Sequence, residues 1–122
     1  TGYSVSEIQA KRIEVAEKYT GAWRKTIVLK GAYTVVAAPD GRSAILPLSS
    51  SALAKAGSGD ILAGIIASFL AQRDMDPFDA ACLGVWVHGT AGLKAQARLG
   101  NPYSTMATDI LNSIPKSINS LL

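Results

Sequence analysis

The chain has 122 residues, of which 48% are apolar and 17% charged, so its length and composition predict one packed domain and exclude a disordered segment. The formal charge of +3 comes from scattered lysines and arginines without a dense basic run, and we expect no nucleic-acid partner. Because Cys82 is the only cysteine, neither an internal disulfide nor a cysteine metal cluster can form, and a cytoplasmic setting is expected. No apolar run reaches the roughly 18 residues that span a membrane, so no membrane contact is expected.

The first predicted element is an amphipathic helix over residues 6–19. Ser4 and Glu7 have the spacing of a capping box, in which a hydroxyl precedes a glutamate by three positions. Apolar side chains then recur on one face at helical spacing. Thr20 and Gly21 are expected to end this helix.

Three strands are predicted next, over residues 26–29, 33–37 and 43–48. The first is a β-branched apolar run and is expected to be buried. A Pro-Asp-Gly-Arg turn at residues 39–42 joins the second strand to the third and makes a hairpin. Pro47 has no N–H to donate, so the third strand is expected at an edge of the sheet.

The remainder of the chain is predicted to be helical. An apolar helix begins near residue 60, is expected to be buried over most of its surface, and breaks at residues 73–75. Asp76 and Pro77 form the cap and first position of a helix that runs to about Leu99. A short helix over residues 107–114, capped by Ser104 or Thr105, precedes a final turn that begins at Pro115.

A Gly-Ser-Gly-Asp stretch at residues 57–60 is the strongest candidate for chemistry. Glycines let backbone N–H groups approach a ligand, and the first turn of a helix favours an anion such as phosphate. Asp60 beside such an anion site could take a proton from an attacking hydroxyl, which indicates phosphoryl transfer. On spacing alone, a tight turn at Gly57 and Gly59 followed by an ordinary helix-start aspartate is about equally compatible.

Other polar residues give weaker signals. Lys30 and Gly31, between two predicted strands, could contact a nucleotide, although an ordinary edge lysine and turn glycine is the simpler interpretation of that segment alone. His88 is expected to be a half-buried structural histidine, and no metal site is predicted around it. The hydroxyl of Ser58, like those of residues 49–51, shows no spacing that pairs it with a histidine, so a hydrolase triad is not expected.

Taken in order, four segments resemble the C-terminal half of the ADP/ATP-dependent NAD(P)H-hydrate dehydratases, which belong to the ribokinase-like superfamily. They are Leu-Lys-Gly-Ala-Tyr-Thr-Val at residues 29–35, Pro-Asp-Gly-Arg at 39–42, Ala-Leu-Ala-Lys-Ala-Gly-Ser-Gly-Asp-Ile-Leu-Ala-Gly at 52–64, and Leu-Gly-Val-Trp-Val-His-Gly-Thr-Ala-Gly at 83–92. The Gly-x-Gly-Asp element is shared across the superfamily. The Lys-Gly-Ala-x-Thr and His-Gly-x-Ala-Gly elements point to this member.

The resemblance implies an α/β fold of the three-layer ribokinase-like kind, of which residues 1–122 are the C-terminal part of a single domain. It also implies a metabolite-repair reaction, in which ADP or ATP phosphorylates the hydroxyl of hydrated NADH or NADPH and phosphate is then eliminated, with Mg²⁺ bridging phosphate oxygens. By this resemblance Asp60 deprotonates and contacts the substrate, and the nucleotide site has two parts. Gly57, Ser58 and Gly59 hold the transferred phosphate, and Lys30, Gly31, Ala32, Tyr33 and Thr34 line the rest.

Two departures from the family pattern concern nucleotide choice and rate. Ser50 and Ser51 stand where members often have Asn-Pro, and Lys55 stands where they often have threonine. Family members are longer and are often homo-oligomers, so the chain is expected to be an excerpt of a domain and to assemble. Two other functions stay open: a small-molecule kinase of the same superfamily, of hydroxyethylthiazole or pyridoxal type, and a nucleotide-binding module without chemistry.

Overall fold

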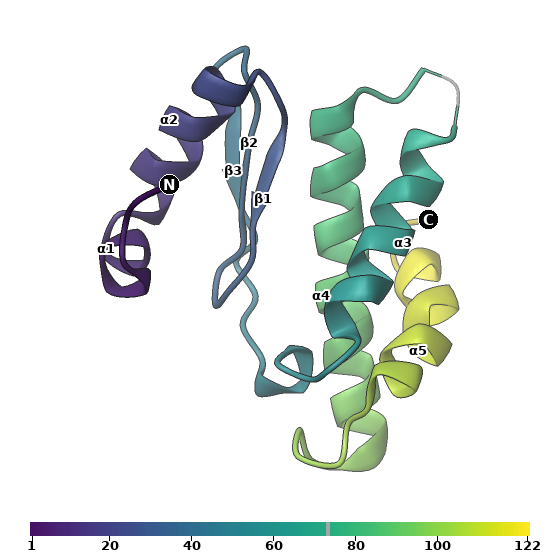
Figure 1. Cartoon of the computed structure of the whole chain (residues 1–122). Coiled ribbons are helices and arrows are strands. Elements are labelled where there is room, and N and C mark those ends of the chain that lie inside the picture. The colour runs from purple at the N-terminus through teal and green to yellow at the C-terminus, as the bar shows by residue number, and fades with distance from the viewer. Residues whose placement is uncertain (73) are drawn as a thin grey trace.

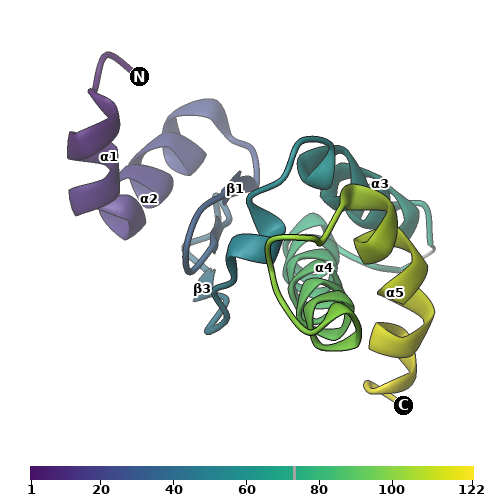
Figure 2. The ribbon, with the colours of Figure 1, turned by 90° about the horizontal axis from the view of Figure 1, so that it is seen from below.

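The computed structural model describes residues 1–72 and 74–122, and the expected order of a helical segment, three strands and a helical remainder is confirmed. Helix α2 (Arg12–Trp23), with the short α1 (Val5–Ala10) beside it, covers one face of a small sheet (Figure 1). Helix α4 (Pro77–Leu99) covers the other face, and α3 (Ser58–Leu70) and α5 (Ala107–Asn119) pack on α4. Seen end-on, the sheet lies between two helical layers (Figure 2).

The predicted first helix is interrupted at Lys11, whose φ of −134° and ψ of 43° are not helical. The capping box at its start is confirmed, because the Ser4 N–H donates to Glu7 Oε2 at 2.7 Å and the Glu7 N–H donates to Ser4 Oγ at 3.3 Å. Hydrogen bonding to the Glu7 carboxylate lowers the pKa of that group. Because the backbone leaves the helical conformation at Lys11, α1 and α2 are separate helices.

The expected end of this helical region at Thr20 and Gly21 is wrong. Helix α2 continues to Trp23 and is capped by Arg24 in the left-handed conformation, with φ 53°. Thr20 is buried, and its hydroxyl donates to the carbonyl of Ala37 at 3.2 Å in the neighbouring strand. Contact with the sheet thus keeps these residues helical, although their local helix propensity favours an earlier end of the helix.

The sheet has three antiparallel strands in the order β1 (Ile27–Leu29), β2 (Val35–Ala37), β3 (Ser43–Ile45). Each strand is shorter than predicted, and β3 ends before Pro47 at the edge, as expected. β2 is fully buried in the centre, whereas β1 is only half-buried. The expectation of a buried first strand is therefore wrong, because β1 forms the other edge of the sheet.

The alternation of side chains along the strands supplies two apolar clusters, one on each face of the sheet. Val35 and Ala37 point toward Ala16 of α2, with Leu29 packed beside them. Val36 points the other way, and the cluster on that face joins the sheet to α3 and α4 through Leu46, Leu62, Ala81 and Val85. The helical layers are thus held to the sheet by buried apolar contact.

Helix α3 is less buried than the sequence predicts. Among its residues only Ser58, Leu62 and Ile65 are buried, and Leu70 near its end is 46% exposed. In the part of the chain that the structure describes, α3 packs on α4 and α5, which cover one side of it. The predicted break after α3 includes Arg73, which lies outside the described residues.

Helix α4 has the predicted bounds. Asp76 caps it by accepting from the N–H groups of Phe78 at 2.7 Å and Asp79 at 3.2 Å. Gly84 lets α3 approach closely, since a Cβ there would lie 2.5 Å from Ile66 Cγ1. No helix in the described part of the chain is both long and apolar enough to cross a membrane.

Helix α5 differs from its prediction at both ends. Its cap is Met106, whose N–H donates to Asp109 Oδ2 at 3.0 Å, so neither Ser104 nor Thr105 has this role. The helix runs through Pro115 to Asn119 and does not give way to a turn there. Ser117, after the proline, is buried and donates to the carbonyl of Val87 at 3.0 Å, which ties this last turn to α4.

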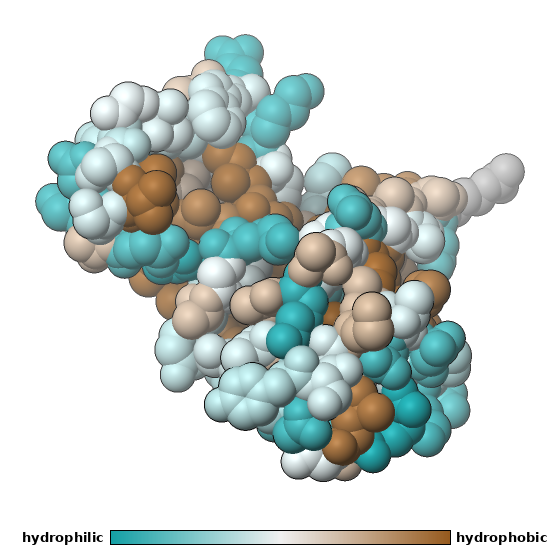
Figure 3. Space-filling model, turned by 60° about the horizontal axis from the view of Figure 1, so that its bottom comes forward, coloured by the Kyte–Doolittle hydropathy of each residue, from teal (hydrophilic) through white to brown (hydrophobic). Residues whose placement is uncertain are grey.

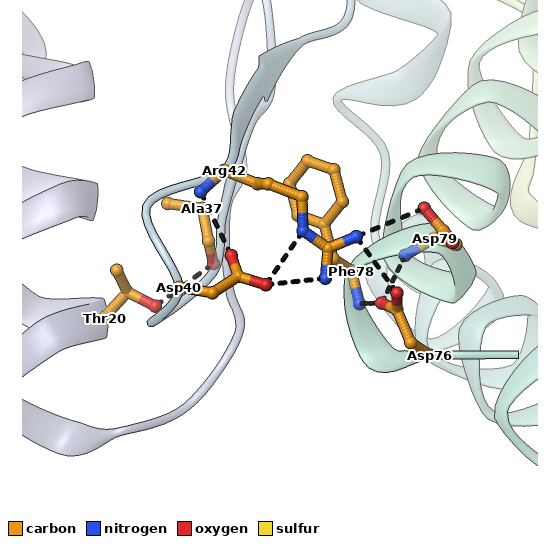
Figure 4. Close-up of polar contacts among 7 residues, drawn as sticks. All are labelled: Thr20, Ala37, Asp40, Arg42, Asp76, Phe78 and Asp79. Carbon is orange, nitrogen blue, oxygen red and sulfur yellow. Dashed lines mark hydrogen bonds and ion pairs between the residues drawn. The ribbon is translucent and has the colours of Figure 1, made fainter.

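An ion-pair cluster joins the turn between β2 and β3 to the start of α4 (Figure 4). The Arg42 guanidinium lies 2.8 Å from Asp40 Oδ2 and 3.0 Å from Asp76 Oδ2, and its centre is 4.6 Å from the ring centroid of Phe78. Hydrogen bonds from Arg42 lower the pKa values of Asp40 and Asp76. The hairpin is therefore attached to the helical layer at a point remote in sequence.

Candidate functional site

The first turn of α3 has a backbone donor without an acceptor in the described part of the chain. Gly57 precedes the helix with φ 80°, a left-handed conformation that suits glycine, and it provides no side-chain cap. The N–H of Ser58 donates to the carbonyl of Lys55 at 3.1 Å, and that of Asp60 donates to Gly57 at 3.2 Å. Among the described residues no acceptor faces the N–H of Gly59, which leaves it available to an anion.

Lys30 brings a positive charge to the same turn. Its ammonium lies against Gly59, and a Cβ on that glycine would be 2.6 Å from Lys30 Nζ. No carboxylate in residues 1–72 and 74–122 lies within 4.0 Å of this ammonium. A cation beside the positive end of a helix is electrostatically unfavourable without a counter-charge, so the position favours a bound anion.

The loop that carries Lys30 is held by an arginine that sequence reasoning missed. Arg12 of α2 donates from Nη2 to the carbonyl of Leu29 at 2.7 Å and from Nη1 to that of Lys30 at 3.3 Å. Its guanidinium fills the space over Gly31, where a Cβ would lie 2.5 Å from Nη1. Gly31 has φ 150°, and the Thr34 hydroxyl donates to its carbonyl at 3.2 Å. The loop conformation is thus fixed from both sides.

A cavity of about 530 Å³ opens beside Lys30, between the β1–β2 loop and the helical layer. Figure 3 brings this end of the molecule forward and shows polar and apolar surface side by side where the two layers meet. Its polar lining includes Lys30, Thr34, His88 and the serines 49–51, and its apolar lining comes from Leu46, Leu48, Leu53, Leu62 and Val85. Mixed lining of this kind is typical of small-molecule sites.

The predicted site residues are only partly gathered around this cavity. Lys30, Gly31, Ala32 and Thr34 line it, Gly59 adjoins it through the ammonium of Lys30, and Ser58 adjoins it through His88. Gly57 and Asp60 are not part of its lining. Tyr33 does not line it: with φ 57° and 56% exposure, it borders a different hollow on the α2 side of the loop.

Asp60 follows Gly59 directly in the first turn of α3. Its carboxylate is exposed and has no ion pair among the described residues. An exposed, unpaired carboxylate next to a free N–H is accessible to a substrate hydroxyl.

Ser58 and His88 are hydrogen-bonded, which neither chain spacing nor composition indicates. Ser58 Oγ lies 2.9 Å from His88 Nε2, and both residues are buried. His88 is bonded, as a structural histidine would be, but it is more buried than the half-buried residue expected. The pairing of Ser58 with a histidine is not visible in the spacing of the sequence. Burial, and to a smaller extent the charge of Lys30, lower the pKa of His88 against an opposing hydrogen bond with Ser58.

The residues that depart from the family pattern are engaged in other contacts. Ser50 donates to Gln96 Oε1 at 2.6 Å and caps the short 3₁₀ helix η1 (Ser51–Leu53), and Lys55 donates to the carbonyl of Tyr103 at 3.1 Å.

For a metal ion, residues 1–72 and 74–122 contain no group of three His, Cys, Asp or Glu side chains that could hold one. The donor set fits an ion carried mainly by phosphate oxygens and does not fit a protein cage.

A glycine-rich helix start, a lysine without an ion pair among the described residues and an adjoining cavity are typical of α/β proteins that bind phosphorylated ligands. A family model described as NAD(P)H-hydrate dehydratase matches residues 2–116, and the chain therefore belongs to this family. The resemblance noted in the sequence and the expected α/β fold are both confirmed.

Relatives and solved structures agree with this assignment. The chain is 43% identical over 120 residues to a bifunctional NAD(P)H-hydrate repair enzyme of Moorella thermoacetica, covering 98% of this chain and 22% of that protein. It is 44% identical over 90 residues to an ADP-dependent (S)-NAD(P)H-hydrate dehydratase of Neisseria meningitidis, covering 74% and 30%. The crystal structure of the Bacillus subtilis ADP/ATP-dependent dehydratase, co-crystallized with ATP/Mg²⁺, matches all of the chain at a TM-score of 0.92 and 33% identity, over 43% of its own length. The chain thus spans less than half the length of these proteins.

Proposed function

We propose that this chain supplies the phosphate-handling part of an enzyme that repairs hydrated NADH or NADPH at the expense of ADP or ATP. The observation that carries the proposal is the position of Lys30, which lines the cavity and lies against Gly59 at the start of α3. One cation can therefore contact a nucleotide in the cavity and a phosphate at the helix end at the same time. The relatives are named for this activity.

Each candidate residue takes a role from its place in this arrangement. The N–H of Gly59, in the turn that also contains Gly57 and Ser58, holds the transferred phosphate with the Lys30 ammonium opposite. The cavity beside the β1–β2 loop accepts the nucleoside, with Gly31, Ala32 and Thr34 in its wall. Tyr33 takes part only if the loop turns it from the α2 side, where it borders another hollow.

Asp60 is the proposed base. The substrate hydroxyl attacks the terminal phosphorus of the nucleotide, its proton passes to the Asp60 carboxylate, and the bond to the departing nucleotide breaks. The phosphate ester so formed is then eliminated: the carbon–oxygen bond to phosphate breaks, the neighbouring ring carbon loses a proton to solvent, and the new double bond restores the reduced nicotinamide ring. Mg²⁺, when bound, neutralises charge on the phosphate oxygens.

The experiment is phosphate release from ADP and ATP in the presence of hydrated NADH, in the protein that contains this chain and the rest of its domain. We expect turnover that requires the nucleotide, and in Asp60→Asn a loss of turnover of about 100-fold or more with nucleotide affinity retained. Full turnover in Asp60→Asn would exclude the base assignment. A stable phosphorylated product in place of free phosphate would identify a kinase, and nucleotide binding without any turnover would identify a binding module.

The chain is proposed to be the C-terminal part of a single dehydratase domain, since the structural match covers all of it but under half of the solved enzyme. The exposed side of α3 and the half-buried β1 edge support this, because both present surface on which further chain could pack. We expect the whole domain to turn over hydrated NADH and the 122-residue chain alone to show no turnover.

Two further properties are proposed on the strength of family membership. The protein is expected to act in the cytoplasm, where its NADH and NADPH substrates are used, and to form a homo-oligomer without membrane contact. Light scattering on the purified protein gives the oligomeric mass, and a monomer at micromolar concentration would exclude the assembly.

A further inference from the structure

Ser58 and His88 place a hydrogen bond inside the protein, directly behind the first turn of α3. Ser58 is 1% exposed and His88 is 5% exposed, and Oγ lies 2.9 Å from Nε2. The residues are 30 positions apart and belong to different helices, α3 and α4. A buried polar side chain is costly without a partner, so each of these two groups depends on the other.

The close packing of α4 makes this contact possible. At Gly84, one turn before His88, a Cβ would lie 2.5 Å from Ile66 Cγ1 and 3.3 Å from Ile66 Cα of α3, so the two helices pack closely there. At Gly89, next to His88, a Cβ would lie 2.9 Å from Leu46 Cδ2. Side chains at these positions would push α4 away from α3 and from the sheet, and would carry the imidazole out of reach of Ser58.

Ser58 is the middle residue of the turn proposed to bind phosphate. It lies between Gly57, in the left-handed conformation, and Gly59, whose N–H has no acceptor among the described residues. Two glycines give a turn conformational freedom, which would let the Gly59 N–H point in many directions. The side chain of Ser58 offers an anchor that removes this freedom, and His88 is what it is anchored to.

We propose that His88 is a positioning residue for the phosphate-binding turn, acting through Ser58 to direct the Gly59 N–H at the phosphate group that the Lys30 ammonium also contacts. The inference rests on the proposed function, because it concerns the same phosphate. Burial and the nearby charge of Lys30 lower the pKa of His88, so the imidazole is neutral at pH 7 and serves as a hydrogen-bond partner without adding charge. This role differs from that of a base, since His88 lines the cavity proposed for the nucleoside but acts on the phosphate only through Ser58.

The test compares two ligands that differ only in their phosphates, ATP and adenosine, by calorimetric titration of the protein that contains this chain and the rest of its domain. His88→Leu fills the space but cannot form the hydrogen bond, and we expect ATP to bind about tenfold more weakly while adenosine affinity stays unchanged. Ser58→Ala should produce the same selective loss. In the double variant the two losses should not add, because each removes the same bond.

Two variants act as controls. His88→Gln retains a hydrogen-bonding group and should bind ATP within about threefold of the wild type, since its amide can still reach the hydroxyl. Thr90→Val removes a hydroxyl of α4 that bonds Ser117 on the α5 side, and it should leave ATP affinity unchanged. A stability loss shared by Thr90→Val and His88→Leu then cannot be mistaken for the positioning effect.

Unchanged ATP affinity in His88→Leu would overturn the inference, and so would an equal loss for adenosine and ATP. If His88→Leu does not fold, Ser58→Ala decides alone by the same comparison of ligands. Absence of ATP binding in the wild-type protein would instead overturn the proposed function, and the two failures are therefore distinguishable.

Discussion

The guanidinium of Arg42 lies 3.0 Å from the carboxylate of Asp76 and connects the tip of the hairpin to the N-cap of α4. Asp76 therefore has two tasks, because it also accepts the N–H groups of Phe78 and Asp79. The contact closes one end of the interface between sheet and helical layer. The other end of that interface is the cavity beside Lys30, so the hairpin is held at the tip while its opposite loop borders the proposed site.

Arg42→Met is expected to lower the Tm of the protein modestly, because the ion pairs it removes are about half exposed and screened by solvent. The control is Arg24→Met, which removes an arginine without an ion pair among the described residues and should change Tm less. The contribution of Asp40 and Asp76 has a definite pH dependence, since their pKa values are lowered in the folded state. It is present above the ordinary carboxyl pKa of about 4 and is lost as pH falls through the lower folded values. Thermal melts of the wild type and both variants from pH 3 to pH 7 measure this pH-dependent contribution to Tm. Equal Tm values for Arg42→Met and the wild type would contradict the prediction.

Gly84→Ala and Gly64→Ala are expected to change stability in opposite directions. A Cβ at Gly84 would lie 2.5 Å from Ile66 Cγ1 and 3.3 Å from its Cα, so α3 and α4 must separate, at a cost of about 1–3 kcal/mol. A Cβ at Gly64 meets nothing within 4 Å, and the higher helix propensity of alanine should stabilise α3 by about 0.5–1 kcal/mol. Denaturant unfolding of both variants tests the packing. Two stabilising substitutions would show that α3 and α4 do not approach as closely as described.

Gly59→Ala should separate ligand binding from stability. The new Cβ would lie 2.6 Å from Lys30 Nζ, the end of a flexible side chain, which can move away at little cost. We therefore expect a free energy of unfolding within about 1 kcal/mol of the wild type, since alanine also favours the helix. The displaced ammonium no longer lies against the first turn of α3, and ATP affinity should fall by about tenfold or more, as a charge-assisted contact is lost. Titration with ATP checks this, with Gly64→Ala as the matched control on the same helix, and equal affinity in the two variants would exclude Lys30 from the phosphate site.

Local signals in the sequence were sufficient for much of the fold. Asp76 and Pro77 mark the start of α4, Gly100 marks its end as a left-handed C-cap, and the Pro-Asp-Gly-Arg turn marks the hairpin, because caps and turns depend on a few adjacent residues. The errors arise where distant contacts decide. Thr20 stays in α2 because it bonds a strand carbonyl, and α5 continues past Pro115 because Ser117 bonds α4. Neither partner lies within the window that periodicity examines.

The candidate site likewise combines a motif that the local sequence indicates with contacts that only the packing of distant elements creates. The Gly-x-Gly-Asp stretch is recognisable because a helix start without a side-chain cap is a local property. Its link to Lys30 depends on how the sheet packs on α3, and Arg12 reaches the Lys30 loop from a helix 17 and 18 residues earlier in the chain. The pairing of Ser58 with His88 spans two helices and leaves no periodic signal. In each case the missed contact is set by packing between elements and not by the residues of one element.

His88 should make the stability of the protein depend on pH in a defined window. Its pKa is lowered in the folded state, chiefly by burial, whereas the unfolded chain keeps the ordinary value of about 6.5. The groups that face it are Ser58 of α3, which bonds the ring, and Lys30 of the β1–β2 loop, whose charge disfavours a second cation. Between about pH 6.5 and the lower folded pKa, His88 is protonated in the unfolded chain but not in the folded chain. The stability of the protein therefore falls as pH is lowered from about 6.5 toward the folded pKa, and it has its full value above that range. His88→Gln cannot titrate there, and its free energy of unfolding should vary less between pH 7 and pH 5 than that of the wild type. Denaturant unfolding at pH 5, 6 and 7 measures the difference, and parallel pH profiles for the two proteins would show that His88 is not buried as a neutral imidazole.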